Sequence, residues 1–220
     1  INIGTSVLCS QYLGARMHKN MVQVVGVSLI LNLVFGLFVS AILHYGATSL
    51  LSMMGLRPEL MEYGVSYMKI VGVFAFFQAI SLTISASLRS ANKAVYPMMV
   101  TVVVNILNII GNYSLIFGKF GMPALGVEGA AISTAFARGV SMVILFVILF
   151  RKHIPRFPLS YFCPFPFVEL KNLLKIGVPS AGENMSYSFS QVVLTYFINM
   201  LGNEALATRT LSLIHISEPT

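Results

Sequence analysis

Long apolar runs separated by short polar or glycine- and proline-rich segments dominate the chain, and their lengths predict membrane-spanning helices. The runs cover residues 21–43, 63–88, 97–117, 127–150 and 176–201. Each is at least as long as the roughly 20 residues that a helix needs to cross a bilayer. Residues 1–15 read as the tail of a helix already under way, and residues 205–211 begin another. We therefore expect about five complete transmembrane helices and two partial ones.

The segment 151–175 breaks this pattern and predicts a boundary between two lobes. It contains four prolines and then FVELKNLLK, whose apolar spacing is that of an amphipathic helix at a membrane surface. We expect a partial first lobe over 1–150, a linker over 151–175 and the start of a second lobe over 176–210. Pro179 should lie in the first turn of its helix, where a missing N–H is harmless. The final residues, 211–220, resemble a translated sequencing adapter and are set aside as non-native.

Composition supports a membrane protein and argues against an enzyme. Hydrophobic residues form 56% of the chain, charged residues 10%, and the mean hydropathy is +0.82, which excludes an ordinary soluble domain. Aspartate is absent, the histidines are scattered, and Cys9 and Cys163 lack metal or redox spacing. We therefore expect no catalytic residues and no cofactor.

Basic residues indicate the orientation of the helices. Nine of the 14 lysines and arginines fall in or beside the alternate loops 14–20, 89–96 and 151–175. Cytoplasmic loops carry such an excess, so we expect these loops to be cytoplasmic in a multi-pass protein of the cell membrane. This rule explains the net charge of +7 without nucleic-acid binding.

A ladder of polar residues in the middle runs is the main candidate site. Asn105, Asn108 and Asn112 share one helical face, as do Thr134 and Arg138 on the next helix. Asn108 and Arg138 would lie about 16 and about 20 Å from the cytoplasmic side. Unpartnered polar groups in lipid cost several kcal/mol, so this layer predicts the lining of a transport cavity. Alternatively, the asparagines are interhelical hydrogen bonds worth about 0.6–2 kcal/mol each.

Two further polar residues have open interpretations. Glu183 would lie about 10 Å into its span, where it either pairs with Arg138 or acts as a capping carboxylate near its helix start. Gln78 either lines a cavity or bonds a neighbouring helix.

Four motifs occur in order along the chain: GTSVLCSQYLGA, SASLRSANKAVYPM, NILNIIGNYSLIFG with GVEGAAIST, and LLKIGVPSAGEN. They resemble the multidrug and toxic compound extrusion (MATE) family. The resemblance implies a two-lobed bundle of twelve helices, of which this all-α chain would run from the end of helix two to the start of helix eight. It also implies exchange of protons or sodium ions for organic, often cationic, compounds.

The resemblance carries some site residues over. Asn108, Asn112 and Thr134 match three positions at which some members bind the coupling cation, with Asn112 in place of an aspartate. The resemblance therefore implies a sodium site at these three residues. Arg138 argues against such a site, because its fixed positive charge repels a cation. The family's coupling glutamate on helix seven corresponds to Tyr187, one turn after Glu183.

The sequence thus predicts an antiporter that exports amphipathic, often cationic, drugs or toxic compounds by alternating access, with H⁺ or Na⁺ as the coupling ion. Its expected partners are small organic substrates and the lipid bilayer, with no nucleic acid and a monomeric complete protein. The alternatives are a flippase for lipid-linked saccharides of the same broad fold group and a non-transporting membrane domain.

Overall fold

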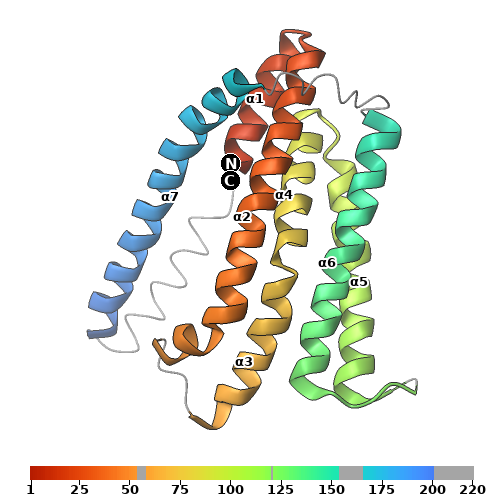
Figure 1. Ribbon diagram of the computed structural model, residues 1–220, viewed down its shortest axis with the longest axis vertical. Helices are drawn as coiled ribbons and strands as arrows, with labels where there is room; N and C mark the ends of the chain where they lie inside the picture. Colours follow the sequence, from red (N-terminus) through yellow and green to blue (C-terminus); the bar gives the residue numbers. More distant parts are fainter. Residues whose placement is uncertain (54–57, 120, 154–165, 201–220) are drawn as a thin grey trace. The chain divides into compact units, whose positions relative to one another are not determined.

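The computed structural model describes residues 1–53, 58–119, 121–153 and 166–200, and these residues confirm the predicted all-α fold. The elements are α1 (Asn2–Gly14), α2 (His18–Met53), α3 (Pro58–Val73), α4 (Ala75–Ser90), α5 (Val95–Phe117), α6 (Gly126–Ile148), the π-helical turn η1 (Leu149–His153) and α7 (Phe167–Met200) (Figure 1). The chain divides into one unit over Ile1–Ile176 and a second over Gly177–Thr220. Cys163 and the predicted segments over 201–220 lie outside the described residues.

Three helices of the described chain are long and apolar enough to cross a membrane. They are α2, α5 and the stretch Gly126–Arg151, and the bent pair α3–α4 makes a fourth if it is one span. The predicted span 176–201 is not among them. Glu183, Asn184 and several serines lie in the middle of α7, and their polarity lowers its hydropathy below that of the other spans.

The helix α2 is longer than predicted. The apolar run was expected to end at residue 43, and residues 44–53, which should have begun a loop, are helical. No proline occurs between Met21 and Met53, and Ala47 is fully buried. The helix therefore continues to Met53, since its backbone meets no breaker and its packed face extends beyond the expected end.

The span predicted for 63–88 is divided into two helices, because the chain bends by 47° between α3 and α4. Both halves pack along α2. A Cβ atom on Gly36 would lie 2.9 Å from Phe76 Cα, and one on Gly72 would lie 2.7 Å from Leu43 Cβ. Glycines thus allow α2 to approach each half closely, and the bend at Phe74 lets both halves follow it.

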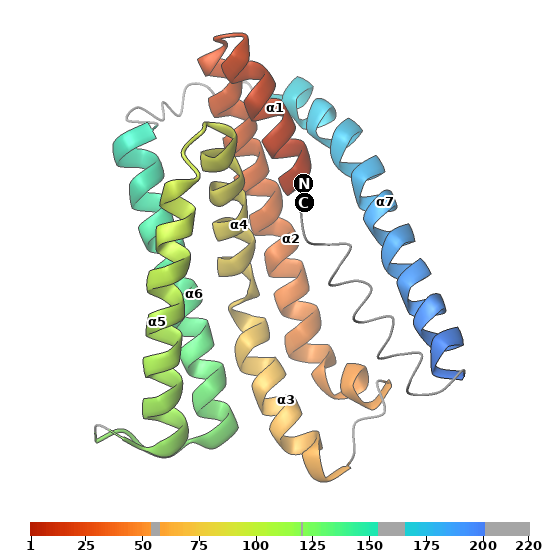
Figure 2. The ribbon, with the colours of Figure 1, turned by 180° about the vertical axis from the view of Figure 1, so that it is seen from behind.

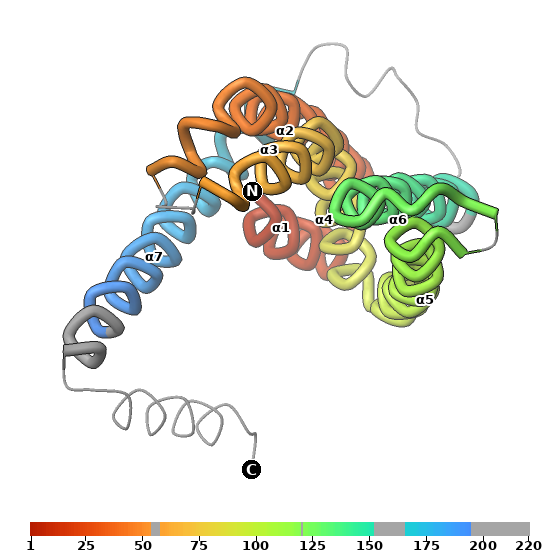
Figure 3. Tube along the Cα trace, turned by 90° about the horizontal axis from the view of Figure 1, so that it is seen from below, coloured from red at the N-terminus to blue at the C-terminus, as the bar shows by residue number. Residues whose placement is uncertain are grey.

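The helices α5 and α6 form a closely packed hairpin (Figures 1 and 2). Gly118 ends α5 with φ +66°, a conformation that glycine adopts without strain, and the Leu125 amide donates to Leu115 O at 2.9 Å. Seen from below, α6 lies between α5 and the α3–α4 pair (Figure 3), and it contacts all three. Pro97 lies in the first turn of α5 as expected.

The position predicted for Pro179 is wrong. The expected linker helix and the following span form one continuous helix, α7, and Pro179 lies inside it. Proline cannot donate to the carbonyl of Lys175, four residues earlier, so the helix loses one backbone hydrogen bond there. The boundary between the two units, after Ile176, falls within the same turn.

The apolar core of the first unit gathers near the ends of the helices that carry Arg16, Arg89 and Arg151. Its fully buried members come from five elements: Cys9, Val24, Val25, Val27, Ile84, Leu88, Leu149 and Leu173. Leu173 belongs to the first turns of α7, so this part of the expected amphipathic helix contributes to the core of the first unit.

A buried carboxylate anchors the start of α7 to the first two helices. Glu169 is 4% exposed. Its Oε2 accepts a hydrogen bond from the Tyr12 hydroxyl at 2.7 Å, and its Oε1 accepts one from Asn20 Nδ2 at 2.8 Å. Both carboxylate oxygens are therefore satisfied, as burial of a charged group requires.

We expect Glu169→Ala to loosen this anchor in a full-length protein containing the chain. Tyr12 and Asn20 would lose their charged acceptor, at a cost of about 1–3 kcal/mol. Hydrogen exchange measured by mass spectrometry should then rise across 167–176. Lys171→Ala, which removes an exposed side chain from the same helix, should leave the exchange unchanged, and equal exchange in the two variants would show that the anchor has no such role.

Candidate functional site

The predicted polar ladder forms a hydrogen-bonded cluster between α5 and α6. Asn112 Nδ2 donates to Asn108 Oδ1 at 2.9 Å, and Asn108 Nδ2 donates to Thr134 Oγ1 at 3.4 Å. The Thr134 hydroxyl in turn donates to Ala130 O at 2.8 Å. The structure therefore brings Asn108, Asn112 and Thr134 together, and the hydrogen bonds run in one direction from α5 into α6. We call these three residues the amide cluster.

Small residues on the facing surfaces allow this cluster to form. A Cβ atom on Gly111 would overlap the Ser133 hydroxyl, and one on Gly129 would lie 2.5 Å from Leu115 O. The Ser133 hydroxyl also donates to Asn108 O at 3.3 Å. Contact between the two backbones at these glycines is what places Asn108 and Thr134 within reach of each other.

One acceptor of the amide cluster remains unused. Asn112 Oδ1 is buried and has no hydrogen-bond partner among the described residues. A buried carbonyl oxygen without a partner costs roughly 1–3 kcal/mol, so a proton donor or a cation at this point would be stabilised. The oxygens of Asn108 and Thr134 each retain a lone pair beside it.

The described residues provide only part of a cation site. All three oxygens of the amide cluster are neutral, whereas hard cations are normally held by several oxygens that include carboxylates. Arg138 follows Thr134 by one turn, is half-buried, and forms no ion pair with a carboxylate in the described parts of the chain. A sodium ion here would therefore need a carboxylate from outside the amide cluster.

The other candidate residues do not join the amide cluster. Asn105 is exposed on α5 and takes part in none of its hydrogen bonds. Gln78 is exposed and lines a separate cavity between α4, α5 and α6. Glu183 is an exposed residue of α7 in the second unit, so its pairing with Arg138 stays a prediction.

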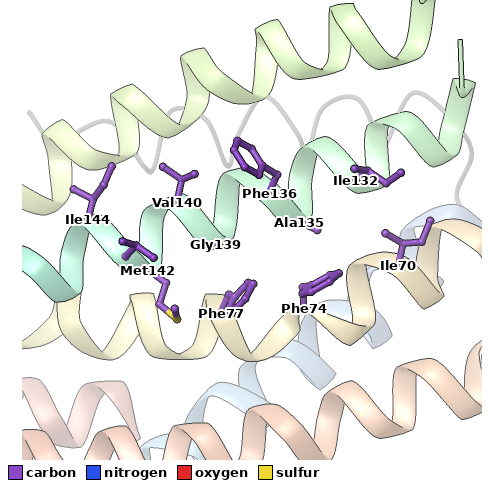
Figure 4. Close-up of a pocket in the computed structure, with 11 residues that line it drawn as sticks. Ile70, Phe74, Phe77, Ile132, Ala135, Phe136, Gly139, Val140, Met142 and Ile144 are labelled. Atoms are coloured by element: carbon purple, nitrogen blue, oxygen red, sulfur yellow. The ribbon is translucent and has the colours of Figure 1, made fainter. Parts of the chain in front are cut away.

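A separate apolar pocket of about 540 Å³ lies between the α3–α4 pair and α6 (Figure 4). Phe74 and Phe77 line one side and Phe136 lies on the other helix. A Cβ atom on Gly139 would lie 3.3 Å from the Phe77 ring, so the absence of a side chain there leaves room for the ring. No residue of the amide cluster lines this pocket, which therefore offers apolar contact alone.

A second polar cluster, which was not predicted, connects α1, α2 and α4. Asn32 Nδ2 donates to Thr83 Oγ1 at 2.6 Å and to Asn2 Oδ1 at 3.2 Å, and Thr5 Oγ1 donates to Ser28 Oγ at 2.7 Å. Asn32 is the one asparagine within the apolar run 21–43. Its amide nitrogen is satisfied by two neighbouring helices, so we interpret this cluster as interhelical hydrogen bonding.

Comparison with known proteins gives one consistent family. The MatE family model matches residues 1–114. The chain is 42% identical to the uncharacterized transporter YisQ of Bacillus subtilis over 95% of the chain and 46% of that protein. It is 30% identical to the probable multidrug resistance protein NorM of Thermotoga maritima over 94% of the chain and 44% of that protein.

Solved structures agree with these relatives. A crystal structure of MATE in the bent conformation matches with 26% identity and a TM-score of 0.84, over 95% of this chain and 46% of the other. The outward-facing conformation of a multidrug resistance MATE family transporter of the MOP superfamily matches with 27% identity and a TM-score of 0.80, over 95% and 46% of the two chains. The chain spans about half the length of the curated relatives that it matches.

Proposed function

Because the chain belongs to the MATE family of multidrug and toxic compound extrusion transporters, we propose that a full-length protein containing it is a secondary active antiporter. It would export amphipathic, often cationic, compounds in exchange for H⁺ or Na⁺. The observation that supports this proposal is the amide cluster, since hydrogen-bonded polar side chains with an unused acceptor lie within α5 and α6, two helices that are long enough to cross a membrane.

Transport in such a protein would use alternating access between two lobes. The amide cluster would supply neutral oxygen ligands on the first lobe, and Asn112 Oδ1 would meet either the coupling cation or a proton donor. A carboxylate from outside the amide cluster would have to neutralise Arg138 when a cation binds, because a lone guanidinium one turn away repels it. The coupling ion therefore depends on a carboxylate that the amide cluster itself does not contain.

The basic end of the helices would face the cytoplasm. Arg16 lies in the turn after α1, Arg89 in the last turn of α4 and Lys93 in the turn that follows. The start of α7 carries Lys171 and Lys175, and the same end holds Arg151. An excess of Lys and Arg marks cytoplasmic loops. We propose on this basis a cell-membrane location with those loops inside. The apolar pocket beside α6 would either face the bilayer or receive an apolar part of the substrate.

Reconstitution tests the proposed antiport. The full-length protein in liposomes should drive movement of tetraphenylphosphonium, a lipophilic cation, against its gradient when either a Na⁺ or a pH gradient is imposed. Dependence on one of the two gradients would identify the coupling ion. Liposomes that accumulate no probe under either gradient, while the protein is inserted and monodisperse, would rule out cation-coupled export of such compounds.

A further inference from the structure

A second cavity, of about 480 Å³, opens between α4, α5 and α6 at the basic end of the helices. One side is a stripe on α4 formed by Gln78, Ser81, Ser85 and Arg89, which share a face because they are three or four residues apart. Thr101 of α5 and Ser141 of α6 add hydroxyl groups from the other sides, and Leu82, Val95, Met98 and Leu145 supply apolar surface. The volume is within the range of small-molecule sites.

The Ser81 hydroxyl is available for a ligand. Ser81 is 5% exposed, and its hydroxyl is buried without a hydrogen-bond partner among the described residues. Three hydroxyls that follow on the helix behave differently, since those of Thr83, Ser87 and Ser90 each donate to the carbonyl one turn earlier. A buried hydroxyl with no partner is costly. A hydrogen bond from Ser81 to a bound acceptor would therefore contribute more to binding than one from a hydroxyl that already has a partner.

The electrostatics of the cavity favour an anion. Among the described residues that line it, Arg89 is the only charged one and none is a carboxylate. The helix α5 begins at its mouth with Ala94 as the N-cap, which provides no side-chain cap, so the positive end of the α5 dipole faces the cavity. At the opposing end of α4, Ser87 O, Leu88 O and Arg89 O accept hydrogen bonds from backbone amides of the following turn, so these carbonyls are satisfied.

We propose that this cavity binds the anionic head, a phosphate or carboxylate, of an amphipathic molecule. The Arg89 guanidinium and the α5 N-terminus would hold the charge, the hydroxyls of Ser81 and Ser85 would donate to the remaining oxygens, and the apolar residues would contact the start of the chain. This site lies apart from the amide cluster and does not depend on the proposed antiport. The head group belongs either to a membrane lipid or to a transported amphiphile, because the two share this chemistry.

Binding of octyl phosphate to the purified, delipidated full-length protein in neutral detergent tests the site. We expect Arg89→Gln to weaken its binding about tenfold and Ser81→Ala roughly threefold, as the loss of a charged and of a neutral hydrogen bond implies. Arg89→Lys should keep most of the affinity. Lys93→Gln is the matched control, since it removes an exposed positive charge from the same turn that does not line the cavity, and it should bind as the wild type does.

A lipid arm separates the two sources. Native mass spectrometry after release from phosphatidylglycerol nanodiscs should show retained lipid that Arg89→Gln abolishes if the occupant is a lipid, and equal retention in both proteins if it is a transported amphiphile. The proposal fails if Lys93→Gln weakens octyl phosphate binding as much as Arg89→Gln does. It also fails if Ser81→Ala and Arg89→Gln, both eluting as folded protein, bind octyl phosphate as the wild type does, or if octyltrimethylammonium binds as tightly.

Discussion

Asn112→Leu in the full-length protein should abolish efflux of a lipophilic cation while leaving expression unchanged. Leucine has nearly the shape of asparagine, so the helix and its packing are retained. The change removes both the Nδ2 group that donates to Asn108 Oδ1 and the buried, unused Oδ1. If that oxygen meets the coupling ion or its proton donor, the loss is worth about 1.5–3 kcal/mol, or tenfold or more in transport rate.

The measurement is resistance and dye efflux in cells, normalised to the amount of protein in the membrane. Ser114→Ala is the matched control, because Ser114 is a buried residue of the same helix whose hydroxyl donates only to Ile110 O. We expect this control to transport as the wild type does. Wild-type efflux by Asn112→Leu would instead assign the amide cluster to helix packing alone, which is the alternative that the sequence left open.

Gly129→Ala should lower the thermal stability of the full-length protein more than the other substitutions that we propose. The added Cβ would lie 2.5 Å from Leu115 O and 2.7 Å from its carbonyl carbon, and backbone atoms cannot move aside as a flexible side chain can. The helices α5 and α6 would have to separate, at a cost of about 1–3 kcal/mol for overpacking. The change should therefore lower the melting temperature and, by lengthening the contact between Asn108 and Thr134, reduce transport by the protein that still folds.

Thermal denaturation of the purified full-length protein measures the first effect. Gly46→Ala is the appropriate comparison, because a Cβ there would meet only the Leu50 side chain, at 3.8 Å, and alanine is the better helix former. We expect that variant to be as stable as the wild type or slightly more so. A Gly129→Ala protein that melts with the wild type would mean that the hairpin is not held by this backbone contact.

The helices that the sequence predicted well are those whose ends carry local signals. The helix α5 has Pro97 in its first turn and Gly118 after its last, and both signals act within a few residues of the helix end. The amide cluster was predictable for a similar reason, since Asn108 and Asn112 share a face by spacing alone and the short hairpin forces the next helix to run beside them. That Asn105 stays outside the cluster was not predictable, because equal spacing does not show how far the contact with α6 extends.

Periodicity, the charge distribution and the order of the motifs were enough to establish an all-α membrane chain of the MATE family, since these properties depend on residues near one another in sequence. Only the tertiary structure revealed four other features: the bend at Phe74, the burial of Glu169, the helix that continues through Pro179, and the unpartnered Ser81 hydroxyl. Each depends on which helices touch, and contact between distant segments follows from close packing of whole surfaces rather than from any local pattern. The two proposed sites differ in the same way. The spacing of the asparagines indicated the amide cluster, whereas the cavity that contains Arg89 is formed only where α4, α5 and α6 come together.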